Sequence, residues 1–448
     1  MYRKESVTVR EWIDHSNKAL LVTGARQTGK TWLIRDEIEK SKYTKFEINF
    51  IDQPDMVTYL NAEMSAENFL IKLKLIMPED CRPHKTIVFF DEIQKCPEIV
   101  TKIKFLVDEG SFKYVMSGSL LGVELKGISS APVGYLSVIR MYPMDFEEFM
   151  IANRVSKATM RMLEEKFETC DPVDEFIHQK LLSMFFVYLI VGGMPDAVKT
   201  YMETKDIREA DKIQRDIRTL YKADFTQYEA EDKKLKLQSI YDIIPAELNK
   251  QNKKFVFTML NKELKFSRYE NSFLWLKDAG VALPVYNVDA PVIPLLASKS
   301  SNVFRLFSSD IGLLTSEYPA ETKMELINKN GEVNNGARFE NAVAQQLTAN
   351  GFVPYFCKKK GLGEIDFVIE MGGKVVPIEV KSGKAYKAHK ALDNFMRVSD
   401  YHLEKAYVFS IGNIETEGAV IYLPIYMCYL LKEQKIGQMI VNLDISGL

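Results

Sequence analysis

The segment from Gly24 to Thr31 reads GARQTGKT and matches GxxxxGK[ST], the pattern of a phosphate-binding loop. An apolar run, ALLVT, precedes it, and a helical pattern, WLIRDEIEK, follows it. Glycines at both ends allow a tight turn whose backbone N–H groups point at phosphate oxygens, at the positive end of the following helix. Similar apolar runs alternate with helical patterns up to about residue 150, which predicts βαβ units and a parallel sheet.

The end of the motif carries the chemistry. Lys30 places a cation on the β- and γ-phosphates of a nucleotide, and the Thr31 hydroxyl completes the coordination of Mg²⁺. The residues expected to surround the nucleotide are Gly24, Ala25, Arg26, Gln27, Thr28, Gly29, Lys30, Thr31 and Trp32. The expected cofactors are therefore ATP and Mg²⁺.

A second strand supplies the acidic half of such a site. The run Thr86-Ile-Val-Phe-Phe90 is followed directly by Asp91 and Glu92. Four apolar residues in a row are typical of a central parallel strand that is covered on both faces. At its carboxyl end, Asp91 would hold Mg²⁺ directly or through water, and Glu92 would orient and deprotonate an attacking water.

A third strand pattern, FKYVMSGS, ends in Ser117 and Ser119. In many P-loop ATPases a polar residue at this position touches the γ-phosphate and the lytic water, so either serine could take that role. A strand that ends in Ser-Gly-Ser is also ordinary turn chemistry, and the sequence leaves both interpretations open.

Composition limits what surrounds this core. The chain of 448 residues is long enough for several domains, and its net charge of −2 provides no global attraction to nucleic acid or membrane. The longest uncharged stretch, 181–195, is shorter than the roughly 20 residues that span a bilayer. The amino terminus shows no secretory signal, and the five scattered cysteines favour a reducing compartment. We therefore expect a cytoplasmic protein with no membrane contact.

Several stretches together resemble one prokaryotic AAA+-related ATPase family of largely undefined role. They are GARQTGKT, FFDEIQ, the SGS strand, PVGYLSVIRMYPMDFEEF, GGMPDAV, IPAELNKQNKKF, FRLFSSDIGLL, GARFEN, GEIDFVIE and PIEVKSG. The resemblance implies an α/β P-loop ATPase core over 1–155, a helical lid over 156–230 and a winged helix over 231–300. A nuclease-like domain of the PD-(D/E)XK type would cover 301–448. After PVG the family often carries Arg or Lys and this chain has Tyr135, which weakens the case for a cooperative ring and leaves a homo-oligomer open.

A second set of polar residues lies in the last part of the chain. Asp366 falls in the strand pattern EIDFVIE, and Glu379 and Lys381 fall in PIEVKSG, where alternate residues share one face of a strand. With Glu340 from a helix, these residues resemble a PD-(D/E)XK site: carboxylates for Mg²⁺ beside a lysine that steadies water or phosphate. A metal-dependent nuclease, a degenerate nucleic-acid binder and an inert scaffold all stay open.

Local charge permits a nucleic-acid partner. Residues 353–390 contain eight lysines against four acidic residues, and Lys250, Lys253 and Lys254 form a small basic stretch in the predicted winged helix. The first hypothesis is an ATPase whose nucleotide state controls a DNA-directed carboxy-terminal domain. The alternative is a nucleotide-dependent switch that binds another protein through an inert adaptor domain, and a purely structural nucleic-acid binder is a third.

Overall fold

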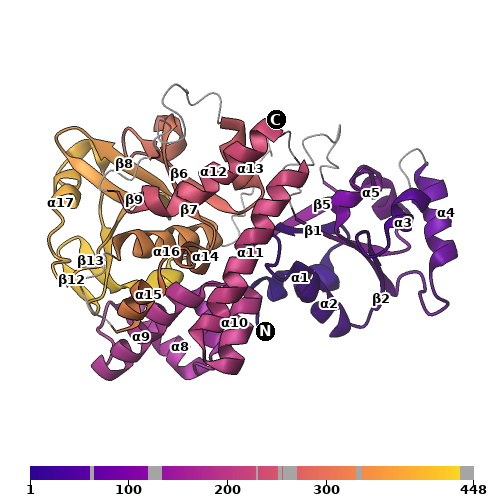
Figure 1. Ribbon diagram of the computed structural model, residues 1–448, viewed down its shortest axis with the longest axis horizontal. Helices are drawn as coiled ribbons and strands as arrows, with labels where there is room; N and C mark the ends of the chain where they lie inside the picture. The colour runs from indigo at the N-terminus through magenta and orange to yellow at the C-terminus, as the bar shows by residue number, and fades with distance from the viewer. Residues whose placement is uncertain are drawn as a thin grey trace, which may run out of the picture.

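The computed structural model describes residues 1–60, 65–119, 134–228, 231–250, 255, 270–328 and 335–433. Figure 1 shows an elongated molecule with one sheet near each end and the long helix α11 between them. Lys253 and Lys254 of the predicted basic stretch lie outside the described residues. Within these ranges, no helix has both the length and the apolar character that a membrane span requires.

The amino-terminal sheet has five parallel strands in the order β2-β3-β4-β1-β5. Its strands are β1 (Ala19–Gly24), β2 (Thr44–Asn49), β3 (Thr86–Asp91), β4 (Lys113–Gly118) and β5 (Leu136–Met141). The helices around it are α1 (Glu5–His15), α2 (Lys30–Glu39), α3 (Pro54–Tyr59), α4 (Ala66–Ile76) and α5 (Glu98–Glu109), with the short 3-10 helix η1 (Ile93–Lys95) after β3. The predicted parallel α/β sheet is confirmed.

Alternate residues of the central strand β3 enter two different cores. Ile87 and Phe89 join a cluster with α1 and α2, whereas Val88 and Phe90 join a cluster with α4 and α5. Successive side chains on a strand point to opposite faces, so a strand covered on both sides must be apolar at every position. This burial holds the carboxyl end of β3, with Asp91 as its last residue and Glu92 directly after it, in a fixed place.

A helical region follows the sheet. It contains α7 (Phe146–Ala152), α8 (Lys157–Thr169), α9 (Glu175–Val191), α10 (Pro195–Thr204), α11 (Ile207–Tyr228), α12 (Glu231–Leu248) and α13 (Glu270–Asp278). A capping box starts α7, in which Asp145 and Glu148 each accept a backbone N–H of the other. Helix α9 ends at Val191, and the following Gly192, with a φ of +64°, turns the chain toward α10.

The second sheet has eight strands in the order β12-β13-β11-β10-β9-β8-β6-β7. Its strands are β6 (Ala282–Val288), β7 (Lys299–Ser308), β8 (Tyr355–Lys359), β9 (Gly363–Met371), β10 (Lys374–Val380), β11 (Ala406–Ser410), β12 (Glu415–Glu417) and β13 (Val420–Pro424). The helices are α14 (Ile311–Thr315), α15 (Ala320–Ile327), α16 (Gly336–Ala349) and α17 (Lys390–Met396), with the 3-10 helices η5 (Leu295–Ser298), η6 (Ser399–Tyr401) and η7 (Ile425–Leu430). Parallel and antiparallel pairs are mixed.

The segment VALPVYNV, which falls in the predicted winged helix, forms the single strand β6, which pairs antiparallel with β7 and parallel with β8. The hairpin of β6 and β7 thus forms one end of the eight-stranded sheet, with β7 as the edge strand, and residue 300 lies inside β7. The largest hydrophobic core joins helices of the predicted lid to this sheet, for example Phe185 of α9 to Phe339 of α16 at 6.0 Å between ring centroids. The winged helix, the nuclease-like domain and the division at residues 155, 230 and 300 stay predictions.

Candidate active site

The loop between β1 and α2 has the backbone geometry that its glycines permit. The φ angles of Gly24, Gln27 and Gly29 are +142°, +62° and +90°. A Cβ atom on Gly24 would lie 2.2 Å from the carbonyl oxygen of Met141, on the neighbouring strand β5. Only glycine fits at that position, because the two backbones approach too closely for a side chain.

Lys30 begins α2 with a side chain that is turned back over the loop and only 6% exposed. Its Nζ donates to the carbonyl oxygens of Gly24 at 3.1 Å and Ala25 at 2.7 Å. Among the described residues no carboxylate lies within ion-pair distance of this ammonium, and burial lowers the pKa of Lys30 to about 8. A buried cation whose partners are neutral carbonyls fits a site for an anion such as phosphate.

The side chains of Thr31, on α2, and Asp91, at the end of β3, lie in contact as the sequence predicts. The Thr31 hydroxyl donates to Asp91 Oδ1 at 2.9 Å and lies 3.1 Å from Oδ2. Asn49 Nδ2 donates to Oδ2 at 3.0 Å, and the Ser117 hydroxyl donates to Oδ1. Burial raises the pKa of Asp91, which is 1% exposed, while these hydroxyls oppose the rise. A hydroxyl beside a carboxylate is an oxygen donor set that fits Mg²⁺.

Glu92 follows β3 in a left-handed conformation, with φ of +56°. Gln94 Nε2 donates to Glu92 Oε2 and also to the Ser119 hydroxyl at 3.2 Å. The carboxylate of the predicted base is therefore connected through one amide to the end of β4. Of the two predicted serines, Ser117 contacts Asp91 and Ser119 belongs to the Glu92 network.

The loop is also tied to helix α11. The Arg26 guanidinium forms an ion pair with Asp224 and donates from Nε to the Ser119 hydroxyl at 3.3 Å. The Tyr221 hydroxyl, one turn earlier on α11, donates to the Arg26 carbonyl oxygen at 2.8 Å. Two side chains of one helix thus hold one residue of the phosphate loop.

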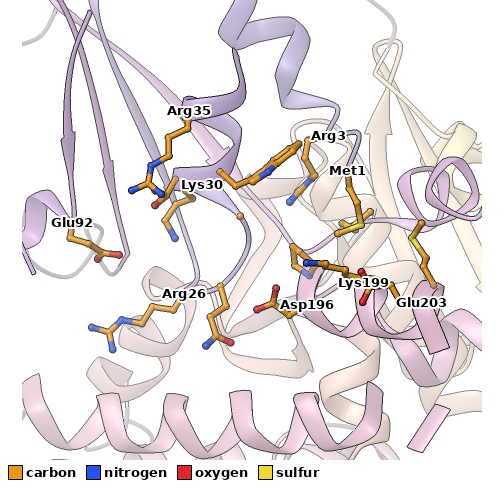
Figure 2. Close-up of a pocket in the computed structure, with 16 residues that line it drawn as sticks. Met1, Arg3, Arg26, Lys30, Arg35, Glu92, Asp196, Lys199 and Glu203 are labelled. Carbon is orange, nitrogen blue, oxygen red and sulfur yellow. The ribbon is translucent and has the colours of Figure 1, made fainter. Parts of the chain in front are cut away.

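A cavity of about 790 Å³ opens beside the loop, which is large enough for a nucleotide. Figure 2 shows Lys30 and Glu92 in one part of it, and Asp196, Lys199 and Glu203 of α10 in another. Further lining residues are Met1, Arg3, Arg26, Gln27, Gly29, Thr31, Trp32, Arg35, Met144, Pro195 and Met202. Of the nine predicted loop residues, Gly24, Ala25 and Thr28 are absent from this lining.

Arg3, which lines the cavity, holds the phosphate loop through a hydrogen bond to its backbone, and sequence analysis misses it. Its guanidinium donates to the carbonyl oxygen of Thr28, to Glu148 Oε1 at 2.9 Å and to the Tyr142 carbonyl oxygen at 2.7 Å. The side chain is 2% exposed. An arginine near a chain terminus is ordinarily solvated, so no sequence signal points to this role.

The four residues of the predicted second site also gather in one place. Glu340 is buried on α16, Asp366 on β9 and Glu379 at the end of β10, and the Lys381 ammonium lies 2.7 Å from Glu379 Oε1. Asp366 Oδ2 accepts the backbone N–H of Val380 at 3.0 Å. Burial and the charge of Asp366 raise the pKa of Glu379 to about 8.

A cation of the protein itself lies among these acids. Arg305, on β7, is 1% exposed, and its Nη1 is 3.4 Å from Glu340 Oε2 and 3.5 Å from Asp366 Oδ1. Its Nη2 pairs with Glu364, and its guanidinium lies 4.7 Å from the ring centroid of Phe356. Sequence analysis misses Arg305, because nothing in FRLFSS distinguishes a buried arginine from a solvated one.

This arrangement does not fit a magnesium site. The Arg305 guanidinium occupies the space between the carboxylates of Glu340 and Asp366, and one Asp366 oxygen is already taken by a backbone N–H. Nowhere in the described ranges do three or more His, Cys, Asp or Glu side chains form a group that could hold a metal ion. A metal-binding role for Glu340, Asp366 and Glu379 stays a prediction that this arrangement of the side chains does not favour.

Comparison with known families gives a match that covers the phosphate loop, the acidic end of β3 and the serines at the end of β4. Residues 16–150 match the family described as "AAA domain". The chain contains an AAA-type P-loop ATPase domain. Residues 183–323 and 335–427 match two families that are each described as a domain of unknown function, DUF8612 and DUF4143. No curated protein sequence matches the chain.

Solved structures resemble the chain only in part. A Walker-type ATPase of Pyrococcus abyssi is 14% identical, with a TM-score of 0.39 over 70% of this chain and 94% of that one. Cdc6p from Pyrobaculum aerophilum is 12% identical (TM-score 0.29; 74% of this chain, 95% of that one). AMPPCP-bound DnaA from Aquifex aeolicus is 14% identical (TM-score 0.29; 59% and 73%). The assignment of the domain therefore rests on the family match and the geometry of the loop.

Proposed function

We propose that this protein binds ATP with Mg²⁺ in the cavity beside the phosphate loop and hydrolyses it. The observation that carries the proposal is the meeting of the buried Lys30 ammonium, the Thr31 hydroxyl and the Asp91 carboxylate at the ends of β1 and β3. The first supplies a cation for phosphate, and the other two supply oxygen ligands. The family match of residues 16–150 supports the same class of activity.

Each residue has a defined part in the proposed reaction. Lys30 would move from the loop carbonyls to the β- and γ-phosphates, while Thr31 and Asp91 would hold Mg²⁺, which when bound neutralises charge on the phosphate oxygens. Glu92 would accept a proton from a water whose oxygen attacks the γ-phosphorus in line. The bond from the γ-phosphorus to the bridging oxygen breaks, and ADP leaves with that oxygen.

The nucleotide state would be transmitted to the rest of the molecule through Arg26. This residue lies in the loop that wraps the phosphates, and it is held by Asp224 and Tyr221 of α11. A loop that closes on a triphosphate would pull on this helix, and α11 packs against α9 and α14, whose side chains belong to the core that includes the second sheet. We propose that α10 and α11 act as the lid of the ATPase core.

Calorimetric titration with ATP and Mg²⁺, together with phosphate-release kinetics, tests the proposal. We expect binding by the unaltered protein and a loss of at least about tenfold in affinity for Lys30→Ala, since a charge-assisted contact to phosphate is removed. Lys18→Ala removes an exposed lysine one residue before β1 and is the matched control. Absence of ATP binding by the unaltered protein would refute the proposal.

For the carboxy-terminal part, the geometry favours the adaptor over the nuclease. Arg305 supplies between Glu340 and Asp366 the positive charge that a metal ion would supply in a PD-(D/E)XK nuclease. We therefore propose a nucleotide-dependent switch, with the ATPase core over 1–155, the lid over 156–230, a winged helix over 231–300 and a nuclease-related adaptor over 301–448. Its partners would be nucleic acid or another protein.

Incubation with plasmid DNA and Mg²⁺ or Mn²⁺ separates the two functions. The adaptor predicts no cleavage with ATP, with ADP or without nucleotide. Cleavage that is abolished by Asp366→Ala and retained by Lys30→Ala would instead establish the nuclease.

A further inference from the structure

A second groove, which shares no lining residue with the nucleotide cavity, lies between the edge of the first sheet and the hairpin edge of the second. It has a volume of about 340 Å³, enough for one nucleotide unit. Its walls come from β5, from the end of α13, from β6 and β7, and from the loop between α16 and β8. We call it the basic groove, after Arg140, Lys277 and Lys299.

These three cations have no acidic partner among the residues that the structure describes. Within the described ranges, none of them lies within ion-pair distance of a carboxylate, and no Asp or Glu lines the groove. All three residues are exposed. Burial lowers the pKa of Lys299, and the neighbouring charge of Lys277 lowers it further, so the two ammonium groups repel each other. A polyanion would relieve that repulsion.

Aromatic rings alternate with the cations. The Lys299 ammonium lies 3.8 Å from the ring centroid of Tyr286, and the Arg140 guanidinium lies 5.5 Å from that of Tyr142. Tyr355 lines the same groove. Cations beside aromatic rings are the combination with which proteins bind single-stranded nucleic acid, because phosphates meet the cations and unstacked bases meet the rings. The bases of a duplex are stacked inside it and cannot reach such rings.

We propose that the basic groove binds a segment of single-stranded nucleic acid, with its phosphates on Arg140, Lys277 and Lys299 and a base against Tyr286 or Tyr142. The charge complementarity of the groove carries this assignment. The basic groove would give the proposed switch a defined surface for nucleic acid. This surface does not involve the cluster around Arg305, nor the part of the predicted winged helix that lies outside the described residues.

The groove is also next to the phosphate loop. Arg140 Nη2 donates to the carbonyl oxygen of Lys277 at 2.8 Å, at the end of α13. In the turn that follows, a Cβ atom on Gly280 would lie 3.1 Å from the backbone nitrogen of Ala25. One turn of the chain therefore separates the two sites. We expect ATP to change the affinity of the groove, and this second part rests on the proposed ATPase function.

The affinity of the full chain for a short labelled oligothymidylate, measured by fluorescence anisotropy without ATP or ADP, tests the proposed groove. The double variant Lys277→Ala, Lys299→Ala should bind at least about tenfold more weakly, and the slope of log affinity against log salt should shrink by about 1.4, or about 0.7 for each lost phosphate contact. The control, Lys157→Ala with Lys212→Ala, removes the same charge from exposed positions on α8 and α11 and should bind normally. Both doubles alter exposed side chains, and circular dichroism checks their folding.

Three results would contradict the proposal for the groove. They are no binding of the oligothymidylate at low salt, equal affinity of the double variant and the unaltered protein, and tighter binding of a duplex of the same length. Calorimetry with ATP on the same samples keeps the two proposals apart. The groove variants should retain the ATP affinity of the unaltered protein, whereas Lys30→Ala should bind ATP at least about tenfold more weakly. Failure of either measurement leaves the other proposal standing.

Discussion

Arg26, in the phosphate loop, forms an ion pair with Asp224 on α11, across 198 residues of sequence. The same guanidinium donates to Ser119, whose hydroxyl also accepts from the amide that holds Glu92. A single residue thus joins the predicted base, the phosphate loop and the predicted lid. We therefore expect a change at the phosphates to reach the predicted lid first through Arg26.

The first prediction concerns the lid side of that ion pair. Asp224→Asn removes the charge that holds Arg26, so ATP turnover should fall by about fivefold or more, and ATP should no longer protect the amides of α11 from hydrogen exchange. The measurement is phosphate release together with exchange followed by mass spectrometry. Asp216→Asn, at an exposed position of the same helix, should leave both unchanged. ATP-dependent protection that persists in Asp224→Asn would show that Arg26 does not transmit the change.

The second prediction concerns the base. Glu92→Gln keeps the shape and hydrogen bonding of the side chain but cannot accept a proton, so kcat should fall by about 10²- to 10⁴-fold while the Kd for ATP stays the same. Phosphate-release kinetics and calorimetry measure the two quantities. Glu98→Gln, at the exposed start of α5, is the control. If Glu92→Gln had a normal kcat, the group that accepts the proton from water would not be Glu92.

The third prediction concerns the buried cation of the second cluster. Arg305→Met leaves Glu340, Asp366 and Glu364 without the guanidinium that compensates them, which should lower the free energy of unfolding by about 3–5 kcal/mol. Urea unfolding measures the loss, and Arg397→Met, at an exposed position after α17, should cost far less.

Mg²⁺ provides a further readout for Arg305. With the guanidinium gone, added Mg²⁺ should raise the melting temperature of Arg305→Met but not that of the unaltered protein, since only the variant has room for a metal between the carboxylates. An unaltered protein that Mg²⁺ alone stabilises, with no nucleotide present, would contradict the assignment of Arg305 as the built-in cation.

The fourth prediction concerns the joint between α9 and α14. Asp310 is fully buried, and its carboxylate accepts the backbone N–H groups of Gly193 at 2.7 Å and Leu313 at 2.9 Å. Burial raises its pKa from 3.8 to about 6, with these hydrogen bonds opposing the rise. The folded state therefore binds more protons than the unfolded state between about pH 4 and pH 6. This contribution to stability is present below about pH 4 and is lost as the pH rises to 6, by up to about 3 kcal/mol.

Melting temperatures measured between pH 4 and pH 6 test the predicted titration of Asp310. Asp310→Asn does not titrate, so its melting temperature should fall less steeply between pH 4 and pH 6 than that of the unaltered protein, although its absolute value is lower because an amide N–H₂ opposes the Gly193 N–H. Asp108→Asn, at an exposed position near the end of α5, should keep the original slope. Identical slopes for Asp310→Asn and the unaltered protein would place the titrating group elsewhere.

Sequence analysis predicted the phosphate-loop end of the molecule because its parts are locally encoded. The glycines of GARQTGKT set the turn, and the apolar runs before Gly24 and Asp91 place both at the carboxyl ends of parallel strands. Strand ends of a parallel sheet share one edge, so Thr31 and Asp91 meet although 60 residues separate them. The confirmed part of the fold, the parallel α/β sheet, follows from the same alternation.

The remaining contacts were decided by packing between distant segments. A buried arginine and a solvated one look alike in sequence, so only the folded chain shows that Arg3 supports the phosphate loop and that Arg26 holds α11. The second cluster makes the same point more sharply. Strand periodicity in the sequence was enough to predict that Asp366, Glu379 and Lys381 share one region of a sheet. That Arg305 lies among these acids depends on the pairing of β6 with both β7 and β8. Periodicity fixes the face of a strand on which a residue lies, but which strand becomes its neighbour depends on the free energy of the whole core.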